Sequence, residues 1–189
     1  MNFDANIVEW INGHHSEFGD ELMWFVSQPT TWIPLYVLLL VLLWFKVRDW
    51  RVLFIILIGF AIAVGLSDFI CSGVLKPLVA RLRPHYSDLV GLHKVHNYMG
   101  DRYSFCSSHA ANSMAVALLF SLLYRKKIAT VLLMIWVAVV CYSRLYLAAH
   151  YPTDILAGLA IGSLFAVVVW LVLSIVYHVD DEEFRKGDS

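Results

Sequence analysis

Long apolar segments constrain the fold of this chain more than any other feature of its sequence. Five of them, at residues 31–45, 52–70, 107–124, 128–143 and 155–177, reach or approach the roughly 20 residues that a helix needs to cross a bilayer. Charged residues make up 15% of the chain, whereas a soluble domain usually carries about 25%. The sequence therefore predicts an all-α, polytopic membrane bundle of about five transmembrane helices. The short segment 128–143 is expected to need tilt or a locally thinned bilayer.

The first 30 residues form an apolar stripe that is interrupted by Gly13 and Gly19. One or two helices lying in the outer membrane interface are expected here, with tryptophans at headgroup depth. In the alternative, residues 22–45 form a single long kinked span. The chain contains no internal repeat or linker, so we expect one domain with interfacial helices in 1–30 and a transmembrane core in 31–177.

Lys and Arg are distributed unevenly among the connecting segments. The turns at 46–51 and 125–127 each hold three positive residues and are separated by two spans, so both are predicted to be cytoplasmic. The tail, 178–189, is then cytoplasmic as well, with His178 at the interface. Segment 71–106 lies outside in this scheme, although its five positive residues argue the other way. No cleavable signal peptide is predicted, because no Lys or Arg precedes position 46.

Polar side chains are concentrated at four points next to the predicted spans. Lys76 and Arg83 follow the second span, and Ser107, Ser108 and His109 begin the third. Arg144 ends the fourth span, and His150 and Asp154 begin the fifth. Because successive helices alternate in direction, all four points are predicted at the same membrane face. Polar groups are costly in a membrane, so a functional site is the first interpretation.

The residues at the first two of these points favour binding of an anion. Lys76 and Arg83 are seven residues apart and share one face if this segment is helical. Two adjacent cations repel each other unless an anion lies between them, although a solvated charged loop is the alternative. A serine N-cap at Ser107 directs backbone N–H groups towards a phosphate, with His109 in the first turn. An ordinary N-cap with an incidental histidine is the alternative there.

The third motif, Ser143-Arg144-x5-His150-x3-Asp154, is the most specific of the three. The guanidinium of Arg144 matches the geometry of phosphate oxygens. Asp154 is expected within reach of one nitrogen of His150, where a carboxylate selects the tautomer and leaves the other nitrogen free to attack. With a second histidine at the same face, this pattern predicts nucleophilic catalysis.

The remaining histidines and cysteines do not indicate a metal site. His14, His15, His85, His93 and His96 lack the short fixed spacing of a ligand set, so no metal is predicted. Two of the cysteines, Cys71 and Cys106, either pair or stay free, since the sequence does not place their Cα atoms, and the third, Cys141, is expected in an apolar helix. The net charge of −1 argues against a nucleic-acid partner.

Taken together, the three motifs resemble those of the type-2 phosphatidic acid phosphatase superfamily, whose helical core is shared with bacterial acid phosphatases and vanadium haloperoxidases. That pattern is Lys-x6-Arg-Pro, Pro-Ser-Gly-His and Ser-Arg-x5-His-x3-Asp. The first matches residues 76–84 and the third matches 143–154, whereas the middle one reads Cys-Ser-Ser-His at 106–109. Ser108 adds a Cβ where the family has glycine. The similarity extends over roughly residues 20–177.

The resemblance implies a role for each of these side chains. His150 is the implied nucleophile, Asp154 orients it, and His109 protonates the leaving alkoxide and then activates water. The implied phosphate-binding residues are Lys76, Arg83, Ser107, Ser108 through its backbone, and Arg144. No metal and no other cofactor is implied, because fixed cations supply the charge.

Three functional hypotheses follow from this resemblance. The first is a lipid phosphatase in the bacterial cytoplasmic membrane with its site facing the periplasm. Its candidate substrates are phosphatidylglycerol phosphate, phosphatidic acid, undecaprenyl diphosphate and a lipid A phosphate. The second is vanadate-dependent halide oxidation, and the third is a non-catalytic binder or transporter of lipid phosphates. No motif specifies the substrate or the oligomeric state.

Overall fold

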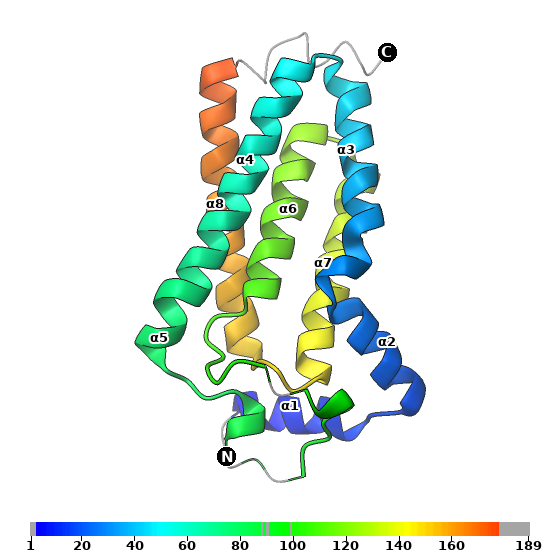
Figure 1. Cartoon of the computed structure of the whole chain (residues 1–189), viewed down its shortest axis with the longest axis vertical. Coiled ribbons are helices and arrows are strands. Elements are labelled where there is room, and N and C mark those ends of the chain that lie inside the picture. Colours follow the sequence, from blue (N-terminus) through cyan, green and yellow to red (C-terminus); the bar gives the residue numbers. More distant parts are fainter. Residues whose placement is uncertain (1–2, 88, 90, 99, 178–189) are drawn as a thin grey trace.

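A computed structural model describes residues 3–87, 89, 91–98 and 100–177, and no strand occurs among them. Five long helices run roughly along one axis (Figure 1). They are α3 (Ile33–Val47), α4 (Trp50–Asp68), α6 (Ser108–Tyr124), α7 (Lys127–Tyr146) and α8 (Pro152–Tyr177). The all-α membrane bundle predicted from the sequence is confirmed.

Four segments are long and apolar enough to cross a membrane, namely Pro29–Val47, Trp50–Val79, Lys127–Tyr146 and Pro152–Val176. The one long helix that is not among these four segments, α6, is shorter at 17 residues and lies at the centre of the bundle. The expectation of a short span at 128–143 was wrong, because α7 continues to Tyr146. In this last part of α7 the Ser143 hydroxyl donates to the Val140 carbonyl and Arg144 donates to the Tyr98 hydroxyl, so polar side chains that would be costly in lipid have partners inside the protein.

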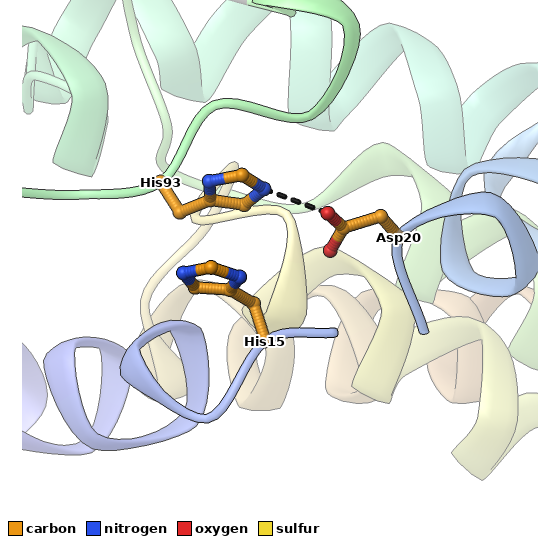
Figure 2. A group of neighbouring side chains, drawn as sticks. All are labelled: His15, Asp20 and His93. Carbon is orange, nitrogen blue, oxygen red and sulfur yellow. Dashed lines mark hydrogen bonds and ion pairs between the residues drawn. The ribbon is translucent and has the colours of Figure 1, made fainter. Parts of the chain in front are cut away.

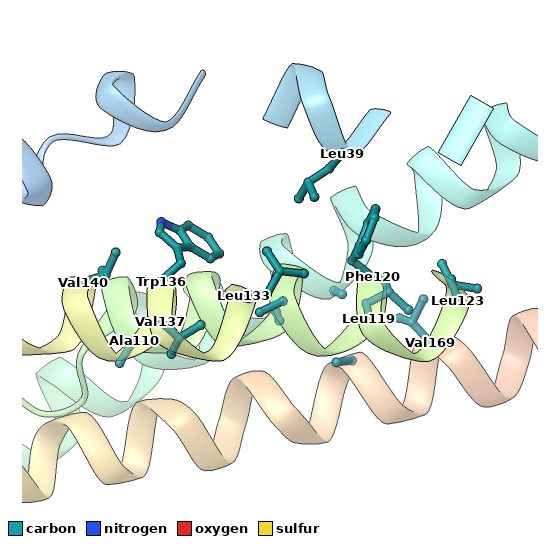
Figure 3. Close-up of a cluster of buried hydrophobic side chains, with 14 of the residues drawn as sticks. Leu39, Ala110, Leu119, Phe120, Leu123, Leu133, Trp136, Val137, Val140 and Val169 are labelled. Atoms are coloured by element: carbon teal, nitrogen blue, oxygen red, sulfur yellow. The ribbon is translucent and has the colours of Figure 1, made fainter. Parts of the chain in front are cut away.

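Apolar side chains, aliphatic and aromatic, fill the centre of the bundle (Figure 3). Phe120 and Leu123 of α6 pack there with Trp136 of α7 and Val169 of α8. Large apolar side chains also point outwards, and Leu38, Ile58, Leu132 and Leu164 are each more than 40% exposed. An apolar exterior on helices of this length is what a hydrocarbon solvent requires.

The closest helix contact in the bundle is between α6 and α8. A Cβ at Gly158 would lie 2.4 Å from the Ser107 carbonyl oxygen, and one at Gly162 would lie 2.1 Å from that of Ala111. Only glycine permits this approach, which the Gly-x3-Gly spacing of membrane helix pairs allows. The contact brings the start of α6 against the start of α8.

The N-terminal region forms two helices that are separate from α3. Helix α1 (Phe3–Gly13) runs crosswise beneath the ends of the long helices, and α2 (Glu17–Ser27) is tilted beside them (Figure 1). A 3₁₀ turn, η1 (Pro29–Trp32), separates α2 from α3, since the proline ring restricts the backbone of the preceding residue. Residues 22–45 therefore do not form one continuous helix. Placement of α1 and α2 in the lipid interface stays a prediction.

The segment between α4 and α6 covers the same end of the bundle. It contains a π-helical stretch η2 (Phe69–Leu75), α5 (Lys76–Val79) and two 3₁₀ turns, η3 (Pro84–Tyr86) and η4 (Val95–Asn97). Cys71 and Cys106 form a disulfide with a Cα–Cα distance of 5.2 Å, which settles the pairing that the sequence left open. Cys141 is free and buried, as expected for an apolar helix residue. The predicted tail, 178–189, lies outside the described residues.

Candidate active site

The chain segments that carry the eight residues singled out in the sequence meet at the end of the bundle where α1 lies (Figure 1). They occupy the region after α4, the start of α6, the end of α7 and the start of α8, as counting the spans predicted. Six of the eight are buried, and Ser108 and His109 are partly exposed.

The backbone between Lys76 and Arg83 has a different conformation from the one predicted. They do not lie on one two-turn helix, because α5 ends at Val79 and Ala80 has a left-handed φ of 49°. Pro84 begins the next 3₁₀ turn instead of ending a helix. The bend still brings both cations to one carboxylate, since Asp101 Oδ2 lies 3.6 Å from Lys76 Nζ and 3.7 Å from Arg83 Nη2.

The start of α6 is joined to both of its neighbours. Ser107 is the N-cap of α6: its Oγ accepts from the Ala110 N–H, and its own N–H donates to the Asp154 carbonyl at 3.0 Å. The hydroxyls of Ser108 and Ser72 are 2.7 Å apart, and Lys76 donates to Ser72 Oγ at 3.4 Å. The serines of α6 thus lie next to the first cation of the site.

Arg144 and Arg83 are almost fully buried, at 2% and 3% exposed. Arg144 donates to the Ser27 hydroxyl and, at 2.9 Å, to the Tyr98 hydroxyl. Among the described residues, the Nε groups of both arginines have no hydrogen-bond partner. A buried cation costs free energy unless an anion compensates it. The carboxylate that pairs with Arg83, Asp101, is 79% exposed, so the set suits an additional anion and does not suit a metal ion.

His150 presents one nitrogen to a cation and the other to a carboxylate. Arg83 Nη1 lies 3.3 Å from His150 Nε2, and Asp154 Oδ2 lies 3.7 Å from Nδ1. A guanidinium can only donate, so Nε2 carries the lone pair and Nδ1 carries the proton. Burial lowers the pKa of His150 well below 6.5, and the charges of Arg83, Arg144 and Lys76 add to this effect. The imidazole is thereby kept neutral, with its lone pair on Nε2.

Arg81, which is not among the residues predicted for the site, forms an ion pair with Asp154. Arg81 Nη1 donates to Asp154 Oδ1 at 3.0 Å and Nη2 donates to Asp4 Oδ2 at 2.8 Å, while its guanidinium stacks 3.8 Å above the Tyr151 ring. Asp4 also accepts from both the backbone and the hydroxyl of Thr153. Asp154 is therefore tied through Arg81 to α1. The position of Arg81 between two motif cations was the only available signal.

A cavity of about 580 Å³ adjoins the site and extends between α3, α4, α6 and α7. Its polar end includes Ser27, Asp68 and His109, and the rest is lined by apolar side chains of the spans, such as Leu43 and Phe60. His109 thus lies between the buried cations and an apolar chamber. A molecule with a phosphate at one end and a hydrocarbon tail at the other matches both parts.

Comparison with known proteins identifies the family. A sequence model of the PAP2 superfamily matches residues 56–176, which include all three motifs. The chain belongs to the PAP2 superfamily. The resemblance drawn from the motifs is thus confirmed, and the match runs from α4 to α8.

Curated relatives cover most of this PAP2 chain. A lipid A 4′-phosphatase of Bacteroides thetaiotaomicron is 34% identical over 85% of the chain and 72% of its own length. A lipid A 4′-phosphatase of Porphyromonas gingivalis is 32% identical over 91% and 73%. An undecaprenyl-diphosphatase of Sulfolobus acidocaldarius is 32% identical over 86% and 75%.

Two solved structures share the fold. A transmembrane PAP2-type phosphatidylglycerolphosphate phosphatase from Bacillus subtilis superposes with a TM-score of 0.68 at 22% identity, covering 92% of this chain and 85% of the other. LpxE of Aquifex aeolicus gives 0.70 at 19% identity, covering 89% and 95%. The helical arrangement of the PAP2 chain is therefore that of membrane phosphatases.

Proposed function

We propose that this protein is an integral-membrane phosphatase that hydrolyses the phosphate ester or diphosphate of a membrane lipid. The observation that carries the proposal is the meeting of buried cations and a neutral histidine beside an apolar cavity. Lys76, Arg83 and Arg144 supply the positive charge, and His150 Nε2 supplies the lone pair. Phosphoryl transfer depends mostly on positioning and on charge stabilisation of the equatorial oxygens, and this set provides both.

In the first step, the lone pair of His150 Nε2 attacks phosphorus and the bond from phosphorus to the lipid oxygen breaks. His109, at the mouth of the cavity, gives its proton to the departing oxygen. Arg81 donates to Asp154, whose Oδ2 lies 3.7 Å from Nδ1, so a carboxylate is held where it can stabilise the positive charge that develops on the imidazole. The products of this step are a phosphohistidine and a lipid alcohol, or a lipid monophosphate from a diphosphate.

In the second step, water attacks the phosphohistidine and the bond from phosphorus to Nε2 breaks. His109, now neutral, takes the proton from water, and inorganic phosphate leaves. The electron pair of the broken bond returns to Nε2, so His150 is restored. Fixed cations carry the charge that a magnesium ion carries in many phosphotransferases, and hydrolysis is therefore expected in the presence of EDTA.

A glycolipid phosphate is the first substrate candidate. Two relatives that match 85% and 91% of this chain are lipid A 4′-phosphatases, which supports a phosphate on a sugar headgroup. Undecaprenyl diphosphate is the second candidate, supported by a relative of that activity with 32% identity. In both cases the hydrocarbon chains would occupy the cavity between the spans.

We place the site at the outer, periplasmic face of a bacterial cytoplasmic membrane. The positive turns at 46–51 and 125–127 lie at the opposite end of the bundle from the site, and such turns favour the cytoplasm. The disulfide between Cys71 and Cys106 lies on the site's side, and disulfides persist in oxidising compartments.

The deciding experiment measures phosphate release by the purified protein in detergent with EDTA. The panel contains a lipid A phosphate, undecaprenyl diphosphate, phosphatidylglycerol phosphate and phosphatidic acid. His150→Ala should lower turnover by more than about 10³-fold, as removal of a nucleophile does. His14→Ala is the matched control, because His14 is exposed and its ring contacts the carbonyl and the ring of Trp10, one turn earlier in the chain.

Two results would count against the proposal. Normal turnover by His150→Ala would remove the nucleophile assignment. Tight binding of one of these lipids by the wild-type protein, with no phosphate released from any of them, would favour a non-catalytic binder or transporter. Brief incubation of the wild type with ³²P-labelled substrate should also leave an acid-labile phosphoenzyme that His150→Ala lacks.

A further inference from the structure

A second cluster of titratable side chains lies apart from the phosphate site, between the N-terminal helices and the outer loop. It consists of His15, in the turn between α1 and α2, Asp20 of α2, and His93 of the loop (Figure 2). His93 Nε2 lies 2.7 Å from Asp20 Oδ2, and the two imidazole rings stack with centroids 3.8 Å apart. Each residue offers one ligand atom, and these atoms lie within 4.8 Å of one another.

The backbone of His93 is held in place by a buried amide. Its N–H donates to Asn12 Oδ1 at 2.7 Å, and its carbonyl accepts from Asn12 Nδ2 at 3.1 Å. The same Asn12 Nδ2 donates to the Tyr146 carbonyl at 2.8 Å, and Asn12 is only 1% exposed. The loop position that carries the His93 imidazole is therefore fixed against both α1 and α7.

The carboxylate of Asp20 is oriented in the same way. Tyr146 donates its hydroxyl proton to Asp20 Oδ1 at 2.8 Å, so Oδ2 is the oxygen that faces the imidazoles. The Tyr146 hydroxyl accepts in turn from the Ser16 N–H at 3.0 Å. Outer partners of this kind are typical of metal sites, where they orient the ligating carboxylate.

Two imidazoles and a carboxylate converge here in a way that an ion pair alone does not require. Stacked imidazoles repel when both are charged, and only His93 contacts the carboxylate. A cation that accepts a lone pair from each ring and one from Asp20 Oδ2 satisfies all three groups. Ligand atoms about 2.0–2.1 Å from a tetrahedral zinc ion are roughly 3.3 Å apart. The two rings are stacked nearly parallel, so metal binding requires the exposed His15 side chain to rotate towards the other two ligands.

We propose that His15, Asp20 and His93 form a binding site for a divalent transition metal ion, with Zn²⁺ the best fit. Nitrogen and carboxylate ligands suit zinc, and three protein ligands leave one position open to water. The ion joins α1 and α2 to the loop that contains Tyr98, whose hydroxyl accepts a hydrogen bond from Arg144. Its role is to fasten that loop beside the phosphate site. The three ligands come from positions 15, 20 and 93, so their spacing along the chain gave no sign of the site.

Zinc binding is measured on the full-length, untagged protein in detergent after treatment with EDTA and dialysis. Calorimetry with ZnCl₂ should give one ion per chain, and the melting temperature should rise as the zinc concentration exceeds the Kd. Co²⁺ in place of Zn²⁺ should give the visible absorption of a site with nitrogen and oxygen ligands. None of these readouts depends on phosphatase activity, so they can fail or succeed independently of the proposed function.

Variants separate this site from adventitious surface binding. Loss of a residue that only orients a ligand weakens metal binding by about 10–100-fold. Tyr146→Phe removes such a residue and should weaken zinc binding by about this factor. His15→Ala and His93→Ala each remove a ligand and should weaken it by at least this factor. His14→Ala and His96→Ala are the controls and should bind zinc as the wild type does. His15 is exposed, so His15→Ala should melt as the wild type does in EDTA.

Three outcomes would overturn the proposal. The first is a wild-type protein that binds no zinc at millimolar ZnCl₂. The second is unchanged affinity in both His15→Ala and His93→Ala. The third is an equal loss of affinity in His14→Ala, which would indicate general binding by exposed histidines.

Discussion

The tight contact between α6 and α8 predicts a large effect from one added methyl group. In Gly162→Ala the new Cβ would lie 2.1 Å from the Ala111 carbonyl oxygen and 2.9 Å from its carbon. An ordinary contact begins near 3.4 Å, so the Cβ is about 1.3 Å too close. The obstacle is backbone and not the end of a flexible side chain. The two helices must therefore move apart by on the order of 1 Å.

This separation acts directly on the site. Helix α6 carries Ser107 and His109, and α8 carries Asp154 in its first turn. The hydrogen bond from the Ser107 N–H to the Asp154 carbonyl is 3.0 Å long, and a shift of about 1 Å breaks it. A displacement of that size costs about 10²-fold in rate when catalytic groups no longer align. Overpacking of this kind also destabilises by about 1–3 kcal/mol.

The assay compares Gly162→Ala with Gly65→Ala, which adds the same methyl group to α4. A Cβ at Gly65 meets no other atom within 4 Å. In that control the better helix propensity of alanine should leave the melting temperature unchanged or higher. Phosphate release and thermal unfolding are measured in detergent on monodisperse protein. Gly158→Ala, with its Cβ 2.4 Å from the Ser107 carbonyl oxygen, should behave like Gly162→Ala.

The result that refutes this reasoning is a Gly162→Ala protein with kcat/KM within about twofold of Gly65→Ala and an equal melting temperature. It would mean that the helices can absorb the methyl group without moving the site. A lower melting temperature with unchanged kcat would separate the two effects. In that case the packing argument would hold and the alignment argument would fail.

Three further changes test other parts of the site. Arg81→Gln removes the guanidinium that holds Asp154. We expect kcat to fall on the order of 10²-fold with KM little changed. An unaltered kcat would argue that Arg81 does not position Asp154 through α1. Asp101→Asn removes a carboxylate that lies 3.6 Å from Lys76 and would compete with a bound phosphate for that cation. Vanadate should therefore inhibit the variant up to about fivefold more tightly than the wild type. Weaker inhibition by vanadate would contradict this reasoning. Because burial and nearby cations lower the pKa of His150, its imidazole stays neutral as pH falls through 6.5. After correction for ionisation of the substrate, kcat/KM should therefore show no acid limb near that value, and an acid limb near 6.5 would indicate an unshifted His150.

The bundle and the meeting point of the motifs could be predicted from the sequence because both follow from counting. Hydropathy identifies spans one segment at a time, and alternation of direction then assigns each polar point to a face. That is how residues as distant as Lys76 and His150 could be expected at one end. The exact path of the chain between Lys76 and Arg83 could not be predicted, because the left-handed turn at Ala80 is not apparent from the apolar pattern.

Apart from the His150–Asp154 pair, the partners of the site residues could not be predicted. Arg81 binds Asp4 from 77 positions away, and Tyr98 reaches Arg144 from a loop without regular structure. Such pairs depend on the positions that the loops take relative to the packed helices. The disulfide between Cys71 and Cys106 also needed Cα positions, which spacing does not supply.

The sequence by itself determined the number of long apolar helices, their order and the chemistry that three local motifs bring to one membrane face. It did so because span length and motif spacing are properties of neighbouring residues. Only the tertiary structure decided how closely α6 approaches α8 at Gly162, which charges surround Asp154, and which histidines meet Asp20. These are distances between parts of the chain far apart in sequence, and packing sets them after the helices have formed.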